Sequence, residues 1–421
     1  MTSSTTDQLA VNGGQKVRTD PWPHRRLFGE EEKQAAIALF DKCIENGEAF
    51  GYEGDEEIGY CREFVEFQGA EGGLADMVNS GTTAVYVALR ALDLEPHTEV
   101  IVPCVTDAGG MMPIVMMNCI PVPADCAPGS YNIGVDQIAA RITERTSAII
   151  VAHISGLPAD MDPIMELARS KGIAVLEDCA QSHGAEYKGK KVGTIGDIAS
   201  FSTMFGKHHA TGGQGGVVYT TNQELHWRGR RAADRGKPHG IDGEDYNVVA
   251  SLNLNQDEMG AAIGRVQLGK LPAIIEGKRR VLLGIADRCQ HLKAVKIVTD
   301  PSYGKNVAWF GWAELDLKKI TIDKNAFVEA LNAEGMIVSA SYTMAIPGEY
   351  PWAREQSVFG SSKLPWSSEQ YAGDANAVYS TPNIYETDKF VFRLNFHEGY
   401  GDQEIADIAA AIEKVENAFL K

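Results

Sequence analysis

The middle of this chain alternates short apolar segments with amphipathic ones, and this alternation limits the possible folds more than any other feature. Residues 147–152 and 173–176 are apolar runs of strand length. Between them, Asp162 followed by Pro163 is typical of a helix start, and Gly172 is typical of a helix end. A strand, a helix and a strand in such close succession predict an α/β fold, with a mostly parallel sheet flanked by helices. Ligands of such sheets gather beyond the carboxyl ends of the strands.

The length of the chain predicts two domains, because 421 residues exceed what one ordinary hydrophobic core organises. We expect a flexible tail over residues 1–20, where the first residues are small and polar. A large cofactor-binding domain is expected over 21–299, and a smaller C-terminal α+β domain over 300–421. The smaller domain is predicted to contain a strand at 309–315 and to end in an amphipathic helix that begins at Asp402.

Charge and cysteine usage exclude several classes of protein. The net charge is −18 and no basic stretch stands out, which argues against binding to nucleic acid. No apolar run is long enough to span a bilayer, and no signal peptide is visible, so no membrane partner is expected. The seven cysteines show neither CxxC spacing nor a zinc pattern, so we expect no metal. Free thiols in a reducing compartment predict a cytoplasmic protein.

Lys207 and Asp178 are the candidate catalytic residues. Asp178 ends an apolar strand, and Lys207 follows a second strand and precedes the glycine run 212–216. A lysine amine in apolar surroundings can form a Schiff base with the aldehyde of pyridoxal 5'-phosphate, and a carboxylate can hold the ring nitrogen of this cofactor protonated. Gln181 lies close enough along the chain to reach the ring hydroxyl. The alternatives are a surface lysine and an acid that caps a helix.

Ser80, Gly81, Thr82 and Ser202 are the candidate phosphate ligands. The first three open a predicted helix, whose free N–H groups and dipole favour an anion. Gly81 allows the backbone to approach closely, and the Ser202 hydroxyl precedes Lys207 at a distance that permits contact with the same phosphate. An ordinary serine cap at the start of the helix is the alternative for Ser80.

Taken together, these motifs resemble the DegT/DnrJ/EryC1/StrS family of sugar aminotransferases. The resemblance extends from about residue 20 to the C-terminus, and the opening Trp22-Pro23 looks like the branch of scyllo-inosose aminotransferases and 3-amino-5-hydroxybenzoate synthase. Each motif is weak alone, and their order and spacing make the resemblance specific. The motifs are Gly13-Gly14, Trp22-Pro23, residues 79–82, 99–103, 156–162 and 177–185, Gly196-Asp197, Phe201-Ser202, Lys207 and residues 213–216.

The resemblance implies pyridoxal phosphate fold type I and a homodimer whose active sites lie at the subunit interface. It implies that Lys207 carries the cofactor, that Asp178 pairs with the ring nitrogen and that Gln181 bonds the ring oxygen. The phosphate ligands it implies are Ser80, Gly81, Thr82 and Ser202, together with Asn253 reaching the phosphate of the neighbouring subunit.

Three positions depart from the family pattern. Asp107 stands about where the family has an aromatic residue that stacks on the cofactor ring. Asn255 replaces an arginine two residues after the interface asparagine, and Gln214 replaces an acid within the glycine run. The motifs of the cofactor site are kept, while residues at its edge differ.

The main hypothesis is transfer of an amino group from Glu or Gln to a keto sugar or keto cyclitol, in aminosugar, aminocyclitol or antibiotic biosynthesis. A second is a dehydratase or aromatising enzyme with the same cofactor. Related dehydratases carry His in place of the lysine, so Lys207 argues against this route. A third is a non-catalytic regulator that binds the cofactor or has lost it.

Candidates for substrate binding fall into two groups. The first lies in the predicted smaller domain, where Arg393 is suited to clamp a carboxylate; its members are Trp309, Tyr342, Arg393 and His397. The second is a basic cluster suited to a phosphate or nucleotide, or else a solvated helix face, and consists of Arg230, Arg231 and Arg235.

Overall fold

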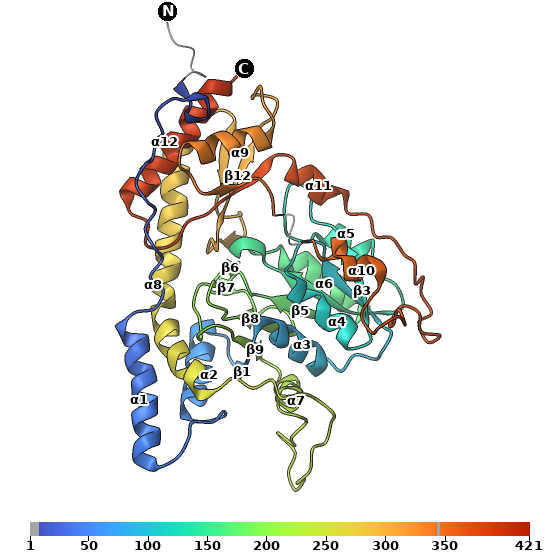
Figure 1. The fold of residues 1–421 in the computed structure, drawn as a ribbon. Coiled ribbons are helices and arrows are strands. Elements are labelled where there is room, and N and C mark those ends of the chain that lie inside the picture. Colours follow the sequence, from blue (N-terminus) through green and yellow to red (C-terminus); the bar gives the residue numbers. More distant parts are fainter. Residues whose placement is uncertain (1–7, 343–345) are drawn as a thin grey trace, which may run out of the picture.

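The computed structural model describes residues 8–342 and 346–421, and a seven-stranded sheet forms its centre (Figure 1). The strand order is β1-β9-β8-β5-β4-β2-β3. Neighbours from β8 to β3 are parallel, whereas β9 is antiparallel to both β8 and β1. The predicted mostly parallel sheet is confirmed. Its strands are β1 (Leu74–Val78), β2 (Glu99–Pro103), β3 (Ile120–Ala124), β4 (Thr146–Ala152), β5 (Ala174–Asp178), β8 (Ile198–Ser202) and β9 (Gly216–Thr220).

Helices cover both faces of this sheet because its central strands are apolar on both sides. On one face, side chains of α3 and α7 share a core with the strands, as Leu89 and Ala232 show. On the other face, Phe64 of α2, Ile164 of α6 and Leu268 of α8 share a second core. The helices are α1 (Glu30–Asn46), α2 (Asp55–Gln68), α3 (Gly81–Ala91), α4 (Met112–Met116), α5 (Val135–Ala139), α6 (Met161–Lys171), α7 (Gln223–Ala233) and α8 (Glu258–Cys289), with short 3₁₀ turns η3 (Ala108–Gly110) and η4 (Ile154–Gly156).

A four-stranded antiparallel sheet of order β10-β12-β14-β13 forms the second unit. Its core contains side chains of α9, α12 and the end of α8, such as Phe327, Ile412 and Leu282. The first strand begins at Val295, near the predicted boundary at residue 300, and that boundary stays a prediction. The elements are β10 (Val295–Val298), β12 (Gly311–Leu315), β13 (Val338–Ser339), β14 (Val391–Leu394), α9 (Lys324–Ala333), α11 (Pro382–Asp388) and α12 (Asp402–Phe419). A third, small sheet joins β6 (Glu186–Tyr187), β7 (Lys190–Lys191) and β11 (Gly304–Lys305).

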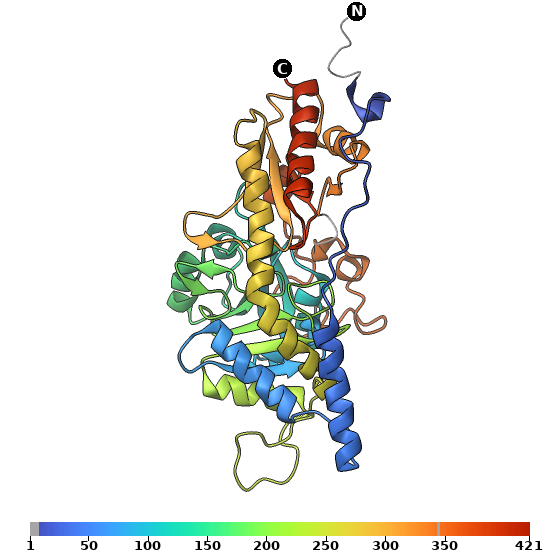
Figure 2. The same cartoon turned by 90° about the vertical axis from the view of Figure 1, so that its left-hand side faces the viewer.

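Helix α8 belongs to both units. Figure 2 shows it running along the molecule from the large sheet to the small one. Leu268 and Leu271 lie in the core of the large sheet, whereas Val281, Leu282 and Ile285 lie in that of the small sheet. A single helix therefore fixes how the two sheets face each other.

The N-terminal segment differs from the predicted flexible tail. Residues 1–7 lie outside the described residues, but residues 8–20 pack against the small unit, and the segment then descends to α1 (Figure 2). Leu9, just before the 3₁₀ turn η2 (Ala10–Asn12), is fully buried. Arg18 forms ion pairs with Glu404 and Asp407. The prediction was wrong for residues 8–20, because their partners lie hundreds of positions away in the sequence.

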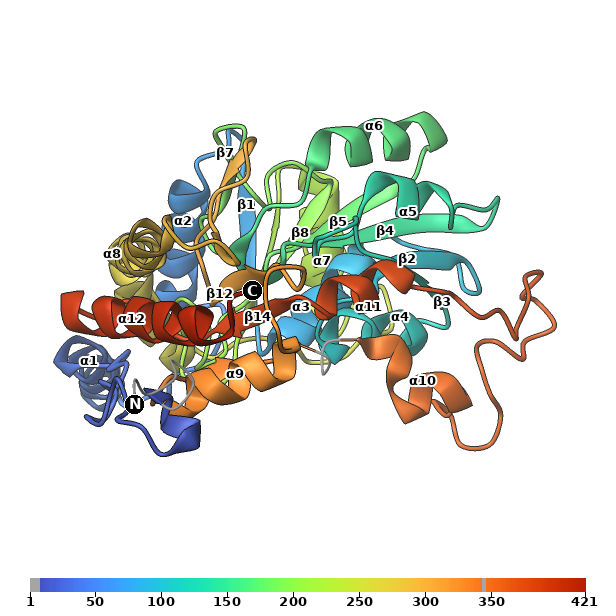
Figure 3. The ribbon, with the colours of Figure 1, turned by 90° about the horizontal axis from the view of Figure 1, so that it is seen from above.

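The described part of the long connection between β13 and α11, residues 340–342 and 346–381, has little regular structure. It contains the 3₁₀ turn η6 (Pro347–Glu349) and α10 (Pro351–Glu355), and its remainder extends away from the body beside α10 (Figure 3). Trp366 and Tyr371 anchor it in a small core with Ile120, and the Tyr371 hydroxyl donates to Glu99 at 3.0 Å.

Replacing Leu9 by Ala tests the packing of the N-terminal segment. Because Leu9 is fully buried, Leu9→Ala is expected to lower the free energy of unfolding by about 2–5 kcal/mol. Val11→Ala is the control, since Val11 lies in the same segment but is 45% exposed, and it should change little. Urea denaturation measures both. Equal, small effects of the two changes would mean that the segment does not pack as described.

Candidate active site

The predicted site residues lie at the carboxyl edge of the large sheet. Strand β5 ends at Asp178 and the adjacent strand β8 ends at Ser202, with Asp178 in register with Ser200. Helix α3 begins at Gly81, beside the end of β8. The small sheet stands above this edge and contributes Trp309 and Tyr342 from its connections.

Lys207 is a buried lysine, as predicted. Its Nζ atom lies 4.0 Å from the centre of the Trp309 indole, a cation–π contact. Burial lowers the pKa of Lys207, while the negative charges of Asp178 and Asp107 act in the opposite direction. A lowered pKa increases the fraction of neutral amine, which is the nucleophilic form.

The backbone of Lys207 is held by a residue that the sequence analysis missed. The guanidinium group of Arg25 donates to the carbonyl oxygen of Lys207 at 2.7 Å and to that of His208 at 3.0 Å. Its Nε pairs with Glu398 at 2.9 Å. Arg25 therefore ties the lysine segment to the chain just before α12. Its nearest sequence signal is the Trp22-Pro23 motif, which gives no indication of this role.

Asp178 is buried close enough to Lys207 for the two charges to interact. Burial raises the pKa of Asp178, whereas the Ala180 N–H, which donates to Oδ1 at 3.0 Å, and the charge of Lys207 lower it. The preceding Glu177 fixes the end of β5 in place. Its carboxylate pairs with His153 at 3.0 Å and accepts N–H groups of Gly193, Ile195 and Gly196.

Gln181 links the large sheet to the small unit. Its Oε1 accepts the Ser155 N–H at 2.7 Å, and its Nε2 donates to the Tyr342 hydroxyl at 3.1 Å. Both contacts leave the side chain buried at the edge that holds Asp178. Burial raises the pKa of Tyr342 to about 12, so this hydroxyl stays protonated at neutral pH.

The candidate phosphate ligands are partly brought together. A Cβ at Gly81 would lie 2.6 Å from the Cβ of Ser202, so this approach requires glycine. The N–H groups of Gly81 and Thr82 occupy helix positions that have no partner within the helix. Ser80 accepts the Thr83 N–H at 3.1 Å, so its hydroxyl serves as the helix cap. Thr82 is exposed beside Gly109.

Asn253 forms an isolated β-bridge with Asp234, at the end of α7. It is exposed and accepts an amide hydrogen from Asn255 at 3.0 Å. Asn255 also donates to Asp234 at 3.1 Å. The neighbouring Leu254 carbonyl accepts the Asn79 N–H at 2.9 Å, which places this segment beside the start of α3. The expected contact of Asn253 with a second subunit stays a prediction.

The positions that depart from the family pattern lie at the rim of the site. Asp107 caps the turn η3 by accepting the Gly109 N–H at 3.0 Å, and its charge acts on both Lys207 and Asp178. Gln214 is exposed. The basic cluster does not present free guanidinium groups: Arg230 pairs with Glu53 and Asp76, and Arg235 pairs with Asp234.

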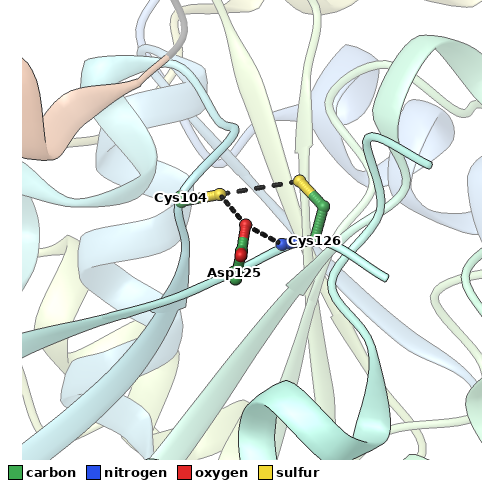
Figure 4. Close-up of side chains that lie close together, drawn as sticks. All are labelled: Cys104, Asp125 and Cys126. Carbon is green, nitrogen blue, oxygen red and sulfur yellow. Dashed lines mark hydrogen bonds between the residues drawn. The ribbon is translucent and has the colours of Figure 1, made fainter. Parts of the chain in front are cut away.

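Three buried side chains at the ends of β2 and β3 have the donor types of a metal site (Figure 4). The sulfur atoms of Cys104 and Cys126 are 3.5 Å apart, and Cys104 lies 3.8 Å from Asp125. The Asp125 carboxylate, however, already accepts N–H groups of Cys126, Asn383 and Ile384. This bonding is that of a structural cluster which anchors α11 to the sheet.

Residues 30–384 match the family model described as the DegT/DnrJ/EryC1/StrS aminotransferase family. A putative L-glutamine:3-amino-2,3-dideoxy-scyllo-inosose aminotransferase from Micromonospora echinospora is 33% identical over 64% of this chain and 63% of its own. 3-Amino-5-hydroxybenzoate synthase from Amycolatopsis mediterranei is 32% identical over 59% of this chain and 62% of its own. The chain thus spans less than two thirds of the length of these two relatives.

Solved structures of aminotransferases share the fold. An aminotransferase from Psychrobacter cryohalolentis superposes with a TM-score of 0.78 at 23% identity, covering 96% of this chain and 100% of that one. DesV from S. venezuelae superposes with a TM-score of 0.77 at 25% identity, covering 96% and 99%. These similarities confirm the fold class that the sequence predicted. None of the helices in the described part of the chain is long and apolar enough to cross a bilayer.

Lys278, a buried lysine of α8 near this site, leads to a pH-dependent prediction. Its Nζ donates to the carbonyl oxygens of Trp309 and Phe396. Burial, with a smaller effect of Arg25, lowers the pKa of Lys278 from the ordinary 10.5 to about 7. Between about pH 7 and 10.5, Lys278 is neutral in the folded chain and charged in the unfolded one, so the free energy of unfolding should rise with pH. Below about pH 7, Lys278 is charged in both states, and the folded chain bears the full cost of burying that charge.

Replacing Lys278 by Met is expected to remove this dependence. The difference in unfolding free energy between wild type and Lys278→Met should then change by up to about 1.4 kcal/mol per pH unit above pH 7. Denaturant titrations from pH 6 to 10 measure it. Lys33→Met is the control, because the side chain of Lys33 is 63% exposed. Parallel pH profiles for wild type and Lys278→Met would contradict the assignment.

Proposed function

This chain belongs to the DegT/DnrJ/EryC1/StrS aminotransferase family, and we propose that it is a pyridoxal 5'-phosphate-dependent aminotransferase that transfers an amino group from Glu or Gln to a keto sugar or keto cyclitol. The observation that carries the proposal is the buried Lys207 amine beside the buried Asp178 carboxylate, at the carboxyl edge of an α/β sheet. This edge is where such sheets bind their ligands.

The residues at this edge fit the cofactor. The close approach of Gly81 to Ser202 brings unpaired helix N–H groups and a hydroxyl to one corner, which suits a phosphate. Lys207, Asp178 and Gln181 are the groups that would hold the aldehyde carbon, the ring nitrogen and the ring oxygen. When bound, the cofactor supplies an electron sink for the carbon that carries the amino group.

The protein's own groups would then control charge and protons. Asp178 would place a negative charge next to the ring nitrogen, and the Ala180 N–H, which donates to its carboxylate, favours that charged form. The Lys207 amine, with its pKa lowered by burial, is suited to take a proton from the substrate carbon and to return it. Arg25 holds the Lys207 backbone through its hydrogen bond to the carbonyl oxygen, so the position from which the Lys207 side chain extends is fixed.

The proposed partners of the chain are a keto sugar or keto cyclitol, an amino acid donor and a second copy of the chain. The relatives named as aminotransferases of scyllo-inosose derivatives support a cyclitol acceptor and a role in aminocyclitol or antibiotic biosynthesis. The free cysteines of the described residues support a cytoplasmic location, where thiols stay reduced.

A homodimer with shared active sites is supported by exposed apolar side chains, one beside Lys207 and others on the segment between α7 and α8. Phe205, two residues before Lys207, is 65% exposed. The segment between α7 and α8 extends from the body below α7 (Figure 1) and exposes Tyr246 by 80% and Leu252 by 59%. A second subunit would cover such a surface and would bring its own Asn253 towards the phosphate corner.

Spectroscopy of the purified protein tests the proposed function. Protein loaded with pyridoxal phosphate should absorb as a lysine-bound cofactor, and Glu or Gln without an acceptor should shift this band as the amino group is transferred. Borohydride should fix the cofactor on Lys207, where peptide mapping finds it, and Lys207→Ala should show no such adduct. Absence of any shift with a range of amino donors would end the proposal. Loss of water from the acceptor without gain of nitrogen, seen by mass spectrometry, would favour a dehydratase.

A pair of glycine substitutions tests the phosphate corner. Gly81→Ala places a methyl group against Ser202 and is expected to raise the dissociation constant of pyridoxal phosphate about 5- to 150-fold, because overpacking of this kind costs about 1–3 kcal/mol. Gly213→Ala is the matched control, since a Cβ there meets nothing within 4 Å, although Gly213 belongs to the glycine run beside Lys207. Equilibrium titration measures both. If Gly81→Ala and Gly213→Ala bound pyridoxal phosphate with equal affinity, the phosphate would not bind at the corner formed by Gly81 and Ser202.

A further inference from the structure

Cys104 and Cys126 are two thiols in contact inside the protein (Figure 4). Their sulfur atoms lie 3.5 Å apart, and the two residues are only 2% and 1% exposed. All seven cysteines belong to the described residues, and no other two of them form a sulfur–sulfur contact. This proximity singles the pair out for chemistry that needs two thiols.

Two adjacent strands of the large sheet bring these thiols together. Strand β2 ends at Pro103 and β3 ends at Ala124, and these two residues are in parallel register. The pairing continues one step further, because the Cys104 N–H donates to the Ala124 carbonyl oxygen at 2.8 Å. Cys126 is held on its other side by an isolated β-bridge to Ile133. Both backbone segments are therefore fixed, and their side chains converge.

A disulfide between the two cysteines requires little movement. The sulfur–sulfur bond of a disulfide is about 2.05 Å long, so the two sulfur atoms have to approach by about 1.5 Å. Two weak contacts oppose this approach. The Cys104 thiol donates to Asp125 Oδ1 at 3.8 Å, and the Cys126 thiol donates to the Tyr131 carbonyl oxygen at 3.4 Å. Because thiols are weak donors, the loss of these contacts costs little.

We propose that Cys104 and Cys126 form an oxidation site, which a hydroperoxide such as hydrogen peroxide converts to a reversible disulfide. In the first step one sulfur attacks a peroxide oxygen and the O–O bond breaks. The leaving hydroxide takes the thiol proton, which gives a sulfenic acid and water. In the second step the other sulfur attacks the sulfenic sulfur, an S–S bond forms, the S–O bond breaks and a second water leaves. The two thiols lose two electrons, which reduce one peroxide to two waters.

The surroundings of the pair determine how it reacts. The hydrogen bond with Cys104, together with burial, raises the pKa of the Cys126 thiol, so the reactive thiolate is scarce and oxidation is slow. Burial also favours a small oxidant over a bulky disulfide. Once a sulfenic acid has formed, the neighbouring thiol is already in place to capture it. The reaction therefore ends at a disulfide, which a thiol reductant reverses, rather than at a sulfinic acid.

The oxidation site joins segments that serve both units of the protein. Cys104 begins the connection to Asp107, which caps η3. A Cβ at Gly110 of η3 would lie 3.4 Å from Asp178 Oδ2, so this turn borders the candidate active site. Asp125, between the two cysteines, accepts N–H groups at the start of α11. The disulfide thus ties the rim of the site to the segment that anchors α11. In a reducing compartment such a disulfide is transient, and the dithiol is the resting form.

Peptide mapping of the full-length protein after oxidation tests this proposal. The reduced protein is treated with hydrogen peroxide, its remaining thiols are blocked in denaturant, and it is digested without reductant. A protease that cuts before aspartate places Cys104 in residues 93–106, Cys119 in 107–124 and Cys126 in 125–135. We expect the first and third peptides to appear linked, with the loss of two hydrogen atoms, and dithiothreitol to separate them.

Single substitutions and an internal reference complete the test. Cys104→Ser and Cys126→Ala should each abolish the link. Cys119→Ser is the matched control and should retain it, because Cys119 is equally buried but its thiol contacts oxygen atoms only.

Cys61 is partly exposed and reports whether peroxide has acted on the protein. Oxidation of Cys61 while Cys104 and Cys126 remain thiols, or sulfinic acids in place of the link, would overturn the proposal. So would a map in which no cysteine is oxidised. The wild-type map alone decides between these outcomes, so a variant that fails to fold does not weaken the test.

Discussion

The attraction between Asp178 and Lys207 within the protein interior is the constraint on which the site depends. Each group opposes the effect of burial on the pKa of the other, so neither would keep its charge as easily alone. Their positions follow from the sheet, because β5 delivers Asp178 and the turn after β8 delivers Lys207. The network around Glu177 and the two hydrogen bonds from Arg25 then hold both segments in place.

Local sequence patterns were sufficient to predict strands and the ends of helices, because residues close together in the chain determine them. The strand that ends at Asp178 was predicted from its apolar run, and Gly172 ends α6 in the left-handed conformation at a φ of 67°. The start of that helix was placed slightly late: Asp160 is the N-cap, and Pro163 falls within the first turn. The Ser80 cap was one of two interpretations of a short motif, and the structure contains it, with Gly81 packed closely against Ser202.

Contacts between distant segments could not be predicted in this way. Arg25 and Lys207 are separated by most of the large unit, and no periodicity links them. Leu9 reads as one apolar residue in a polar stretch, although it completes the core of the small unit. Trp309 and Arg393 were candidates by residue type alone, and only the folded sheets show that Trp309 lies beside Lys207 and Arg393 beside Tyr342. The structure also distinguishes these arginines: Arg230 and Arg235 form ion pairs, whereas Arg393 forms none with the described residues.

The shared helix α8 limits how this protein can be divided. A cut near residue 299 would leave Val281, Leu282 and Ile285 on the first fragment, although they fill the core of the second. The second fragment would lose one wall of its interior, and the first would carry an exposed apolar stripe prone to association. Neither piece would be an autonomous folding unit. Exchange of the C-terminal part between relatives, in evolution or in the laboratory, would have to carry the later turns of this helix along with it.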